Sequence, residues 1–459
     1  MLTSHGSMGT ATALFAILAS SLTTFAASAP GLDRNIDAMA HEVMQSQRIP
    51  GMALCVLQGG RLLASRAYGI ADLENDVPVT NETEFSIASI TKQLTAAAVL
   101  QLSERGLVRL DDDISRFVPD FPVRNAGVTL RRLLNHTAGI RNLQDLGDRY
   151  WKQSAAPAKP RDIIRLFESE PLDFKPGTDY HYSNSGYILL GAVIEKASGE
   201  TYGEYLRKHL FEPLHLKHMT YGGSSALIPH RARGYWVDGS AFINAAHYDD
   251  SQAFSMGGVY SNAEDLAKWV DALHHGRVLK PESYNEMITP EVLPNGEKLT
   301  YGGGVELGEV DGRHVLSHAG GGVGFIGQAL YVREGDLVVV VLTNSSVGGG
   351  AIEMADRIMR QILAIPGPAD LPLPAGLASR FAGHYRMGSD AVDVDQEGGH
   401  LVIRYGKDDV HRLRYQGESI FAQDGRLSRV HFREVDGRVV AFEIARYGSF
   451  LARAKREDR

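Results

Sequence analysis

Two groups of strand-like apolar runs lie far apart in the chain. The upstream runs are MALCVLQ (52–58) and RLLASRAYGI (61–70), and the downstream runs are HVLSH (314–318), FIGQALYV (325–332) and LVVVVLTN (337–344). Gly59-Gly60 joins the first two runs and residues 333–336 join the last two, so each pair is predicted to form an antiparallel hairpin. The segment LVVVVL lacks polar alternation, which predicts a central strand covered on both faces.

Between these strand groups the apolar positions follow a helical period. One helix is predicted over residues 89–104 with Gly106 as its C-terminal cap, and another over 186–197 that ends at Gly199. Residues 261–264 (SNAE) have the form of a capping box before a third helix. Helices inserted between paired strands predict an α/β fold, with an antiparallel sheet flanked by helices and a helical lobe beside it. A cleft between the two lobes is the expected place for a site.

The C-terminal part of the chain has a different pattern. After a helical segment near 351–364 comes IPGPADLPLPAG, whose prolines predict a stiff linker over 366–374. Short alternating runs with turn dipeptides such as Gly398-Gly399 and Asp436-Gly437 follow. They predict a small antiparallel barrel or sandwich over 375–459, and we expect a lipocalin-like β-barrel.

The N-terminus has the pattern of a signal peptide over residues 1–29. An apolar stretch is followed by Ala27-Ser28-Ala29, the A-x-A form of a cleavage site, although no Lys or Arg precedes the stretch and Pro30 follows the cut. The uninterrupted apolar core is short for a bilayer span. We therefore expect a periplasmic or secreted protein with no stable membrane span after cleavage, and an uncleaved anchor is the alternative. Residues 30–365 would form the catalytic domain.

Charge and cysteine content exclude several classes of function. The formal net charge is -8 and no dense basic run is present, so no nucleic-acid partner is expected. Cys55 is the only cysteine, which rules out an intrachain disulfide and a cysteine-based metal site, and its apolar run predicts a buried strand thiol. G-x-S-x-G, H-E-x-x-H and the P-loop pattern are absent. No cofactor and no metal are expected.

Ser89 and Lys92 form an S-x-x-K motif at the head of a predicted helix. A serine hydroxyl needs a base within hydrogen-bond reach to become a nucleophile, and Lys92 at i+3 lies on the same helical face. Lysine serves as that base only if burial or nearby positive charge lowers its pKa. Chance alone gives about one such motif in a chain of this composition, so the motif by itself does not decide the chemistry.

Five sequence segments, the first of which contains the S-x-x-K motif, occur in a characteristic order along the chain. They are TEFSIASITKQLTAAAVLQL, RRLLNHTAGI, FKPGTDYHYSNSGYILLGAVIEKASG, MGGVYSNAEDLAKW and LSHAGGGVGF. Together they resemble the serine β-lactamase-related superfamily over residues 33–360. The resemblance is to its class C branch of β-lactamases, DD-peptidases, D-aminopeptidases and carboxylesterases, and it implies a β-lactamase/DD-peptidase-like fold.

The resemblance implies a role for each catalytic motif. Ser89 matches the acylated serine and Lys92 its partner lysine. Tyr182-Ser183-Asn184 matches Y-x-N, in which the tyrosine shuttles a proton between nucleophile and leaving group. Asn184 would bind the acyl-side amide of the substrate.

His318-Ala319-Gly320 matches the third family motif, [KH]-[TS]-G, and makes His318 a catalytic candidate. The N–H groups of Ser89 and Gly321 would form the oxyanion hole, with Gly320 and Gly321 counted as substrate-binding. β-Lactamases of this branch usually carry Lys-Thr-Gly here. Loss of the lysine charge and the threonine hydroxyl predicts weaker binding of carboxylates.

A second Tyr-Ser-Asn segment and one histidine also have more than one interpretation. Tyr260-Ser261-Asn262 repeats the letters of the Y-x-N motif, but its surroundings match a different family block and predict a helix cap. His136, in NHTAGI, is interpreted as a residue whose hydrogen bond shapes a loop rather than as a proton-transfer group.

The predicted function is a serine hydrolase that forms a covalent acyl-enzyme at Ser89. Amide or peptide substrates, such as D-amino-acid peptides, are favoured because His at the third motif resembles DD-peptidases and D-aminopeptidases. A carboxylesterase or weak β-lactamase is the alternative, and a sensor of β-lactams or peptidoglycan fragments that acylates without turnover is a third. The expected partner is a small molecule or a short peptide, and the oligomeric state stays open.

Overall fold

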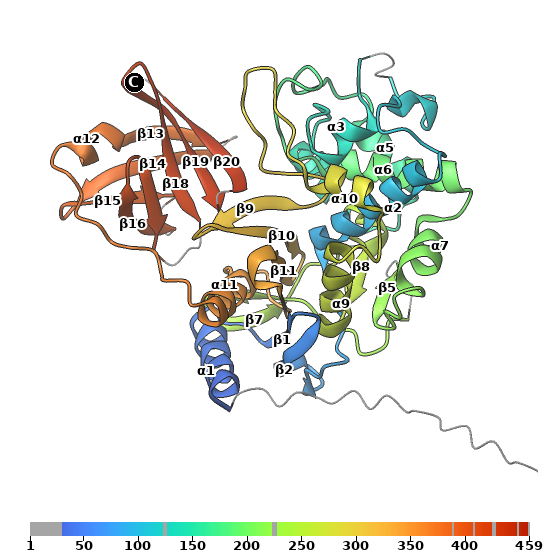
Figure 1. The fold of residues 1–459 in the computed structure, drawn as a ribbon, viewed down its shortest axis with the longest axis horizontal. Helices are drawn as coiled ribbons and strands as arrows, with labels where there is room; N and C mark the ends of the chain where they lie inside the picture. The colour runs from blue at the N-terminus through green and yellow to red at the C-terminus, as the bar shows by residue number, and fades with distance from the viewer. Residues whose placement is uncertain are drawn as a thin grey trace, which may run out of the picture.

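The computed structural model describes residues 30–122, 126–222, 227–387, 390–406, 409–424, 428–447 and 449–457 (Figure 1). The predicted signal peptide, residues 1–29, lies outside this described part. Among the described residues, no helix is both long and apolar enough to cross a membrane.

Within the described residues, seven antiparallel strands form the central sheet, and they come from both ends of the catalytic region as predicted. In spatial order they are β3 (Val77–Pro78), β2 (Arg61–Asp72), β1 (Gly51–Gln58), β12 (Leu337–Thr343), β11 (Phe325–Val332), β10 (Arg313–Gly322) and β9 (Glu306–Val310). Both predicted hairpins, β1–β2 and β11–β12, are present. The sheet is completed when β12 pairs with β1, so that chain segments distant in sequence lie side by side.

Alternate residues of β1 and β12 pack on opposite faces of the sheet. Leu54 and Val339 belong to the apolar core shared with α1 (Pro30–Ser46) and α11 (Gly350–Leu363). Cys55 belongs to the core on the other face, which it shares with α9 (Ala263–His274). The two-sided burial predicted for LVVVVL is therefore confirmed, since helices cover both faces.

Helices α2 (Thr91–Glu104) and α6 (Asn184–Ser198) pack together at the centre of the helical lobe. The other helical segments there are α3 (Leu130–Leu134), α4 (Asp148–Trp151), α5 (Pro160–Phe167), α7 (Tyr202–Leu206), α8 (Phe254–Gly257), α10 (Pro281–Ile288), and the short turns η2 (Ile114–Arg116), η3 (Leu143–Leu146), η4 (Arg207–Phe211) and η5 (Asp250–Gln252). Short strands complete the lobe: β4 (Phe85–Ser86), β5 (Met219–Tyr221) and β8 (Val259–Ser261) in one sheet, and β6 (Tyr235–Asp238) and β7 (Ala241–Asn244) in a hairpin.

All three predicted helix starts differ from the structure, and α6 begins at Asn184, two residues before its predicted start. Ser89 lies in a 3-10 turn, η1 (Ala88–Ile90), and the α-helix begins at Thr91, because the chain enters α2 through a tighter turn. The capping box predicted over 261–264 is wrong. Asn262 is the N-cap of α9 and accepts a hydrogen bond from the backbone N–H of Asp265.

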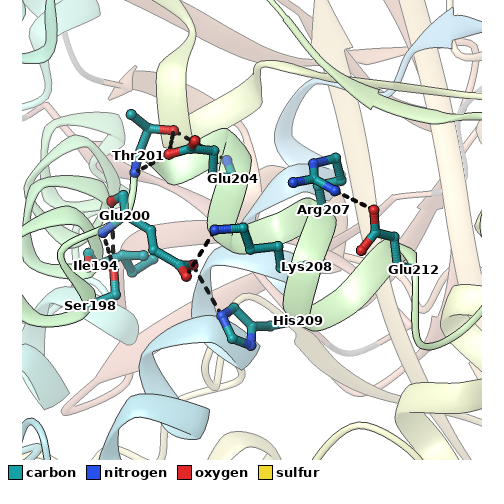
Figure 2. A network of polar contacts seen from close by, with 9 residues as sticks. All are labelled: Ile194, Ser198, Glu200, Thr201, Glu204, Arg207, Lys208, His209 and Glu212. Carbon is teal, nitrogen blue, oxygen red and sulfur yellow. Dashed lines mark hydrogen bonds and ion pairs between the residues drawn. The ribbon is translucent and has the colours of Figure 1, made fainter.

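The end of α6 agrees with the prediction. Gly199 adopts φ 75°, a left-handed conformation that glycine adopts without steric cost. Figure 2 shows the polar network that follows, in which a capping box between Thr201 and Glu204 starts α7. Glu200 accepts from Lys208 at 3.2 Å and contacts His209 at 3.0 Å, which ties the end of α6 to the π-helical turn η4.

The predicted C-terminal β-barrel is confirmed. Its described strands close in the order β13 (Gly383–Met387), β14 (Asp390–Glu397), β15 (His400–Arg404), β16 (Val410–Gly417), β17 (Ile420–Gln423), β18 (Arg429–Val435), β19 (Arg438–Arg446) and β20 (Ser449–Arg456). Phe381, from α12 (Leu377–Phe381), stacks on Phe432 with ring centroids 4.4 Å apart, and Phe421 and Phe442 pack on Phe432. Aromatic side chains thus fill the interior of the barrel.

The position of Cys55 generates a prediction. Its side chain is 1% exposed, and burial raises the pKa of the thiol. Since the thiolate is the reactive species, Ellman's reagent should not modify the folded protein and should modify one thiol after denaturation. Labelling of the native protein at the rate seen in denaturant would contradict this burial.

Candidate active site

The candidate nucleophile, its base and the other hydrogen-bond partners of that base come from four elements. Lys92, in the first turn of α2, has its Nζ 3.0 Å from Ser89 Oγ on η1. The same nitrogen donates to Asn184 Oδ1 at the start of α6 and to the Met256 carbonyl on α8, both at 2.8 Å. The S-x-x-K pair predicted from sequence is therefore in hydrogen-bond contact.

The environment of Lys92 favours a neutral amine. The side chain is fully buried, and this burial lowers its pKa well below the usual value. A neutral amine has two N–H groups and one lone pair. Because the Asn184 and Met256 oxygens can only accept, they take both N–H groups and leave the lone pair for the Ser89 hydroxyl. Lys92 can then accept the serine proton.

Neighbouring amides hold Asn184 in this orientation. Its Nδ2 donates to Gln144 Oε1 at 2.9 Å, so its Oδ1 must face Lys92. Its backbone N–H donates to Asn142 Oδ1 at 3.0 Å. Since an amide nitrogen carries two hydrogens, Gln144 uses one and the other can donate to a substrate.

Tyr182 lines the cavity together with the candidate nucleophile. Burial raises the pKa of its phenol, and an interaction with the Ser89 side chain lowers that pKa in part. Lys92 Nζ is 5.0 Å from the centroid of the Tyr182 ring. A protonated phenol beside the serine can give its proton to a leaving group and recover it later.

His136 fixes the loop that carries Tyr182. Its Nδ1 accepts from the backbone N–H of Ser183 at 3.1 Å, and its ring centroid lies 4.4 Å from that of Tyr182. The loop-shaping hydrogen bond predicted for His136 is present. Burial lowers the pKa of this imidazole, which favours the neutral acceptor that the bond requires.

His318, on β10, is close to the cluster but turned from the nucleophile. Its Nδ1 lies 2.6 Å from the Ala319 carbonyl and its Nε2 lies 2.8 Å from the Tyr301 hydroxyl. A carbonyl can only accept, so Nδ1 carries the proton and Nε2 accepts from Tyr301. Burial lowers the pKa of His318 to about 4, so the ring is neutral near pH 7. The geometry favours a positioning role through Tyr301.

The two glycines of the third motif have different surroundings. Gly321 lines the cavity beside Ser89. Gly320 is buried, and a Cβ there would lie 2.1 Å from the carbonyl oxygen of Ile87. The absence of a side chain at Gly320 therefore allows β10 to approach the chain just before Ser89, and its substrate contact stays a prediction. Ala88 adopts φ 43° at this point, a strained conformation of the kind found at functional sites.

These groups open into a cavity of about 1120 Å³. Ser89, Tyr182, Asn184 and Gly321 lie in its wall. Aromatic side chains including Trp151, Trp236 and Tyr248 line it, as do the charged Arg231 and Asp250. The cavity can hold an apolar group and a polar group of one small molecule.

The second Y-S-N segment contributes to the same cavity. Asn262 caps α9, as the helix-cap interpretation requires, but Tyr260 lines the cavity. Its hydroxyl donates to Asp250 Oδ1 at 3.1 Å and accepts from Arg231 at 2.7 Å. This placement was not predicted, because the spacing of the letters carries no information on which wall the side chain joins.

Other site residues also escaped prediction from sequence. The acceptor for Lys92 at Met256 is a backbone carbonyl, which no side-chain pattern reveals. Gln144 lies in η3, Asn142 precedes that turn and Tyr301 precedes β9, and the positions of these segments depend on contacts distant in the chain. Among the described residues, no cluster of His, Cys, Asp and Glu could hold a metal ion.

An antiparallel sheet, a helical lobe and a serine–lysine–tyrosine cluster between them are features of β-lactamase-type folds. The family model described as Beta-lactamase matches residues 36–364, and the chain belongs to this family. The resemblance inferred from the five motifs is confirmed. Members of the wider superfamily are serine hydrolases, amidases and peptidases among them.

Individual relatives agree with this assignment. Putative penicillin-binding protein PbpX of Bacillus subtilis (strain 168) is 29% identical over 291 residues, which cover 63% of this chain and 69% of that protein. This chain spans about half the length of some other curated relatives.

Solved structures extend the comparison. The octameric penicillin-binding protein homologue from Pyrococcus abyssi has a TM-score of 0.66 at 24% identity and covers 92% of this chain and 99% of its own. The D-amino acid amidase from Ochrobactrum anthropi SV3, complexed with L-phenylalanine amide, has a TM-score of 0.65 at 26% identity and covers 73% of this chain and 99% of its own.

The role of His136 generates a stability prediction. His136→Ala removes the acceptor of the buried Ser183 N–H and should lower the free energy of unfolding by about 1–3 kcal/mol. Denaturant unfolding measures this change. The matched control is His181→Ala, because His181 is exposed and its ion pair with Asp173 should contribute less than about 1 kcal/mol. Equal losses in the two variants would contradict the assigned role.

Proposed function

We propose that this protein is a serine hydrolase that cleaves amide bonds of small molecules or short peptides through an acyl-enzyme at Ser89. The observation that carries the proposal is the contact of Ser89 Oγ with a buried Lys92 amine and with the Tyr182 hydroxyl in the wall of a cavity. A hydroxyl placed between a base and a proton donor is suited to acyl transfer.

The first half of the reaction forms the acyl-enzyme. Ser89 Oγ attacks the substrate carbonyl as its proton passes to Lys92 Nζ. The N–H groups of Ser89 and Gly321 stabilise the negative charge that develops on the carbonyl oxygen. Tyr182 gives its proton to the leaving amine nitrogen as the C–N bond breaks, and the proton held by Lys92 restores the phenol.

The second half releases the acid. A water molecule loses a proton to the Lys92–Tyr182 pair and its oxygen attacks the acyl carbon. The bond from the acyl carbon to Ser89 Oγ breaks, and Ser89 Oγ recovers a proton from the Lys92–Tyr182 pair. Because the pKa of Lys92 is lowered by burial, the amine can act as the base below the usual lysine range, and activity should fall as pH drops through that lowered pKa.

Two features support an amide of a D-residue as the substrate class. The D-amino acid amidase noted above shares this fold at 26% identity. The cavity also combines aromatic and charged walls, which fit an amino-acid side chain and its polar backbone. Ala319 favours a carboxylesterase as the second candidate, because the motif there lacks the hydroxyl that would help to hold a carboxylate.

Replacement of Ser89 tests the proposal. Ser89→Ala should lower kcat/KM by about 10³-fold or more, because the variant cannot form the acyl bond. The assay is a parallel screen of D-amino-acid p-nitroanilides, p-nitrophenyl acetate, nitrocefin and D-Ala-D-Ala peptides.

Each outcome of that screen has a distinct meaning. Unchanged turnover in the variant would defeat the assignment of Ser89. Preference for the acetate ester over the p-nitroanilides would favour the carboxylesterase. A stable single adduct with labelled penicillin and no turnover, seen by intact-mass analysis, would favour a sensor.

The two Y-S-N segments provide a matched comparison. Tyr182→Phe removes the proton donor beside Ser89 and should lower kcat/KM by about 10²- to 10⁴-fold. Tyr260→Phe removes a hydroxyl that contacts Asp250 and Arg231 and should cost no more than about tenfold. The reverse order of the two effects would show that Tyr260 is the proton donor.

A further inference from the structure

A buried ion pair joins the C-terminal barrel to the sheet. Arg446, the last residue of β19, donates through Nη2 to both carboxylate oxygens of Glu306 on β9, each at 2.9 Å. The two residues are 7% and 8% exposed. The approach is close, since a Cβ at Gly308 would lie 2.6 Å from the carbonyl oxygen of Tyr447. Figure 1 shows β9 running from the sheet to the barrel.

Glu306 lies next to the third motif. It pairs with Ser317 in the β9–β10 register and accepts a hydrogen bond from the Ser317 hydroxyl at 3.1 Å. It also forms a β-bridge with Tyr301, the residue that donates to His318. A carboxylate in this place raises the pKa of His318, and the Arg446 guanidinium lowers it. The ion pair therefore acts on His318 as two opposed charges.

Other groups also act on His318. The charged and titratable side chains around it are Glu306 on β9, Arg446 on β19, Lys92 on α2, Tyr182 before α6, Tyr301 before β9 and His136 after α3. Burial is the main cause of the low pKa of His318; Glu306 raises this pKa, whereas Arg446, and Lys92 when it is protonated, lower it further. The charge on Glu306 thus decides how far the pKa of His318 can rise against the effect of burial.

We infer that Arg446 is a positioning residue supplied by the barrel, which neutralises the buried Glu306 carboxylate and so extends to lower pH the range in which a neutral His318 accepts the Tyr301 hydroxyl. Without the guanidinium, the buried carboxylate loses its Arg446 partner and His318 takes up a proton at a higher pH than in the unmodified protein. The imidazolium Nε2–H then donates to Tyr301, and the tyrosine hydroxyl must turn away. This inference rests on the proposed function for its catalytic meaning, but the protonation state is measured without substrate.

The experiment is a titration of histidine in the full chain, labelled with ¹⁵N-histidine and followed by NMR, with the His318 signals assigned from a His318→Gln variant. In the unmodified protein His318 should remain neutral down to the region of its pKa of about 4. In Arg446→Gln the midpoint should rise by about one pH unit or more, because a neighbouring carboxylate shifts a pKa by that amount. In Glu306→Gln/Arg446→Gln, which removes both charges, the midpoint should return towards that of the unmodified protein.

A second ion pair between the two domains provides the matched control. Arg453 on β20 donates to Glu297 at 2.7 Å, and Arg453→Gln should leave the His318 midpoint unchanged. A loss of domain contact alone would affect both arginine variants alike, and only a charge effect is reversed in the double variant. The acid side of the kcat/KM profile should shift with the midpoint in Arg446→Gln.

The outcomes separate this inference from the proposed function. A folded Arg446→Gln protein whose His318 titrates as in the unmodified protein would overturn the inference, as would a shift of equal size in Arg453→Gln. Should Arg446→Gln fail to fold, Arg446→Met keeps the apolar stem and Arg446→Lys keeps the charge; the inference requires a raised midpoint in the first and an unchanged one in the second. Failure of the Ser89→Ala test would remove the proposed function and leave the titration result standing.

Discussion

The site depends on the burial of one lysine amine among neutral oxygens. Removing an ammonium from water costs several kcal/mol, and Lys92 meets this cost by favouring its uncharged form and by hydrogen bonds to Ser89, Asn184 and Met256. These partners belong to η1, α6 and α8, so three segments must converge around α2. The same convergence brings the Ser89 hydroxyl to the lone pair of the amine. Packing and chemistry therefore impose the same geometry.

A second layer of residues holds this centre in place. Gln144 orients Asn184, His136 anchors the backbone beside Tyr182, and Tyr301 links that aromatic cluster to His318. Most of these groups are buried, and burial shifts their pKa values towards the uncharged state. The cluster is thus a network of neutral donors and acceptors in which one added proton would reverse a hydrogen bond. The Glu306–Arg446 pair is important for this reason. Arg446 balances the negative charge of the Glu306 carboxylate, so the network does not lie beside an unbalanced charge.

The C-terminal barrel is accordingly more than an appended unit. Phenylalanine rings pack its interior around Phe432, whereas its outer edge at Arg446 and Arg453 contacts the sheet and the loop before β9. The capping box predicted over 261–264 failed because its letters fit the motif but the chain places Asn262 at the N-cap of α9. Gly320 belongs to a predicted binding motif, and the structure adds that it is a point of close backbone approach to Ile87.

The sequence by itself determined the strand pairs, the central helices, the two-sided burial of LVVVVL and the barrel after the proline-rich segment. These features follow from local periodicity and turn chemistry, which neighbouring residues encode. It also identified Ser89, Lys92 and Tyr182 through ordered motifs. Only the tertiary structure decided that Lys92 donates to the Met256 carbonyl, that Tyr260 joins the cavity wall, that His318 faces Tyr301 and that Arg446 reaches Glu306. Those contacts join residues far apart in the chain, and their geometry arises from how whole elements pack, which no local pattern records.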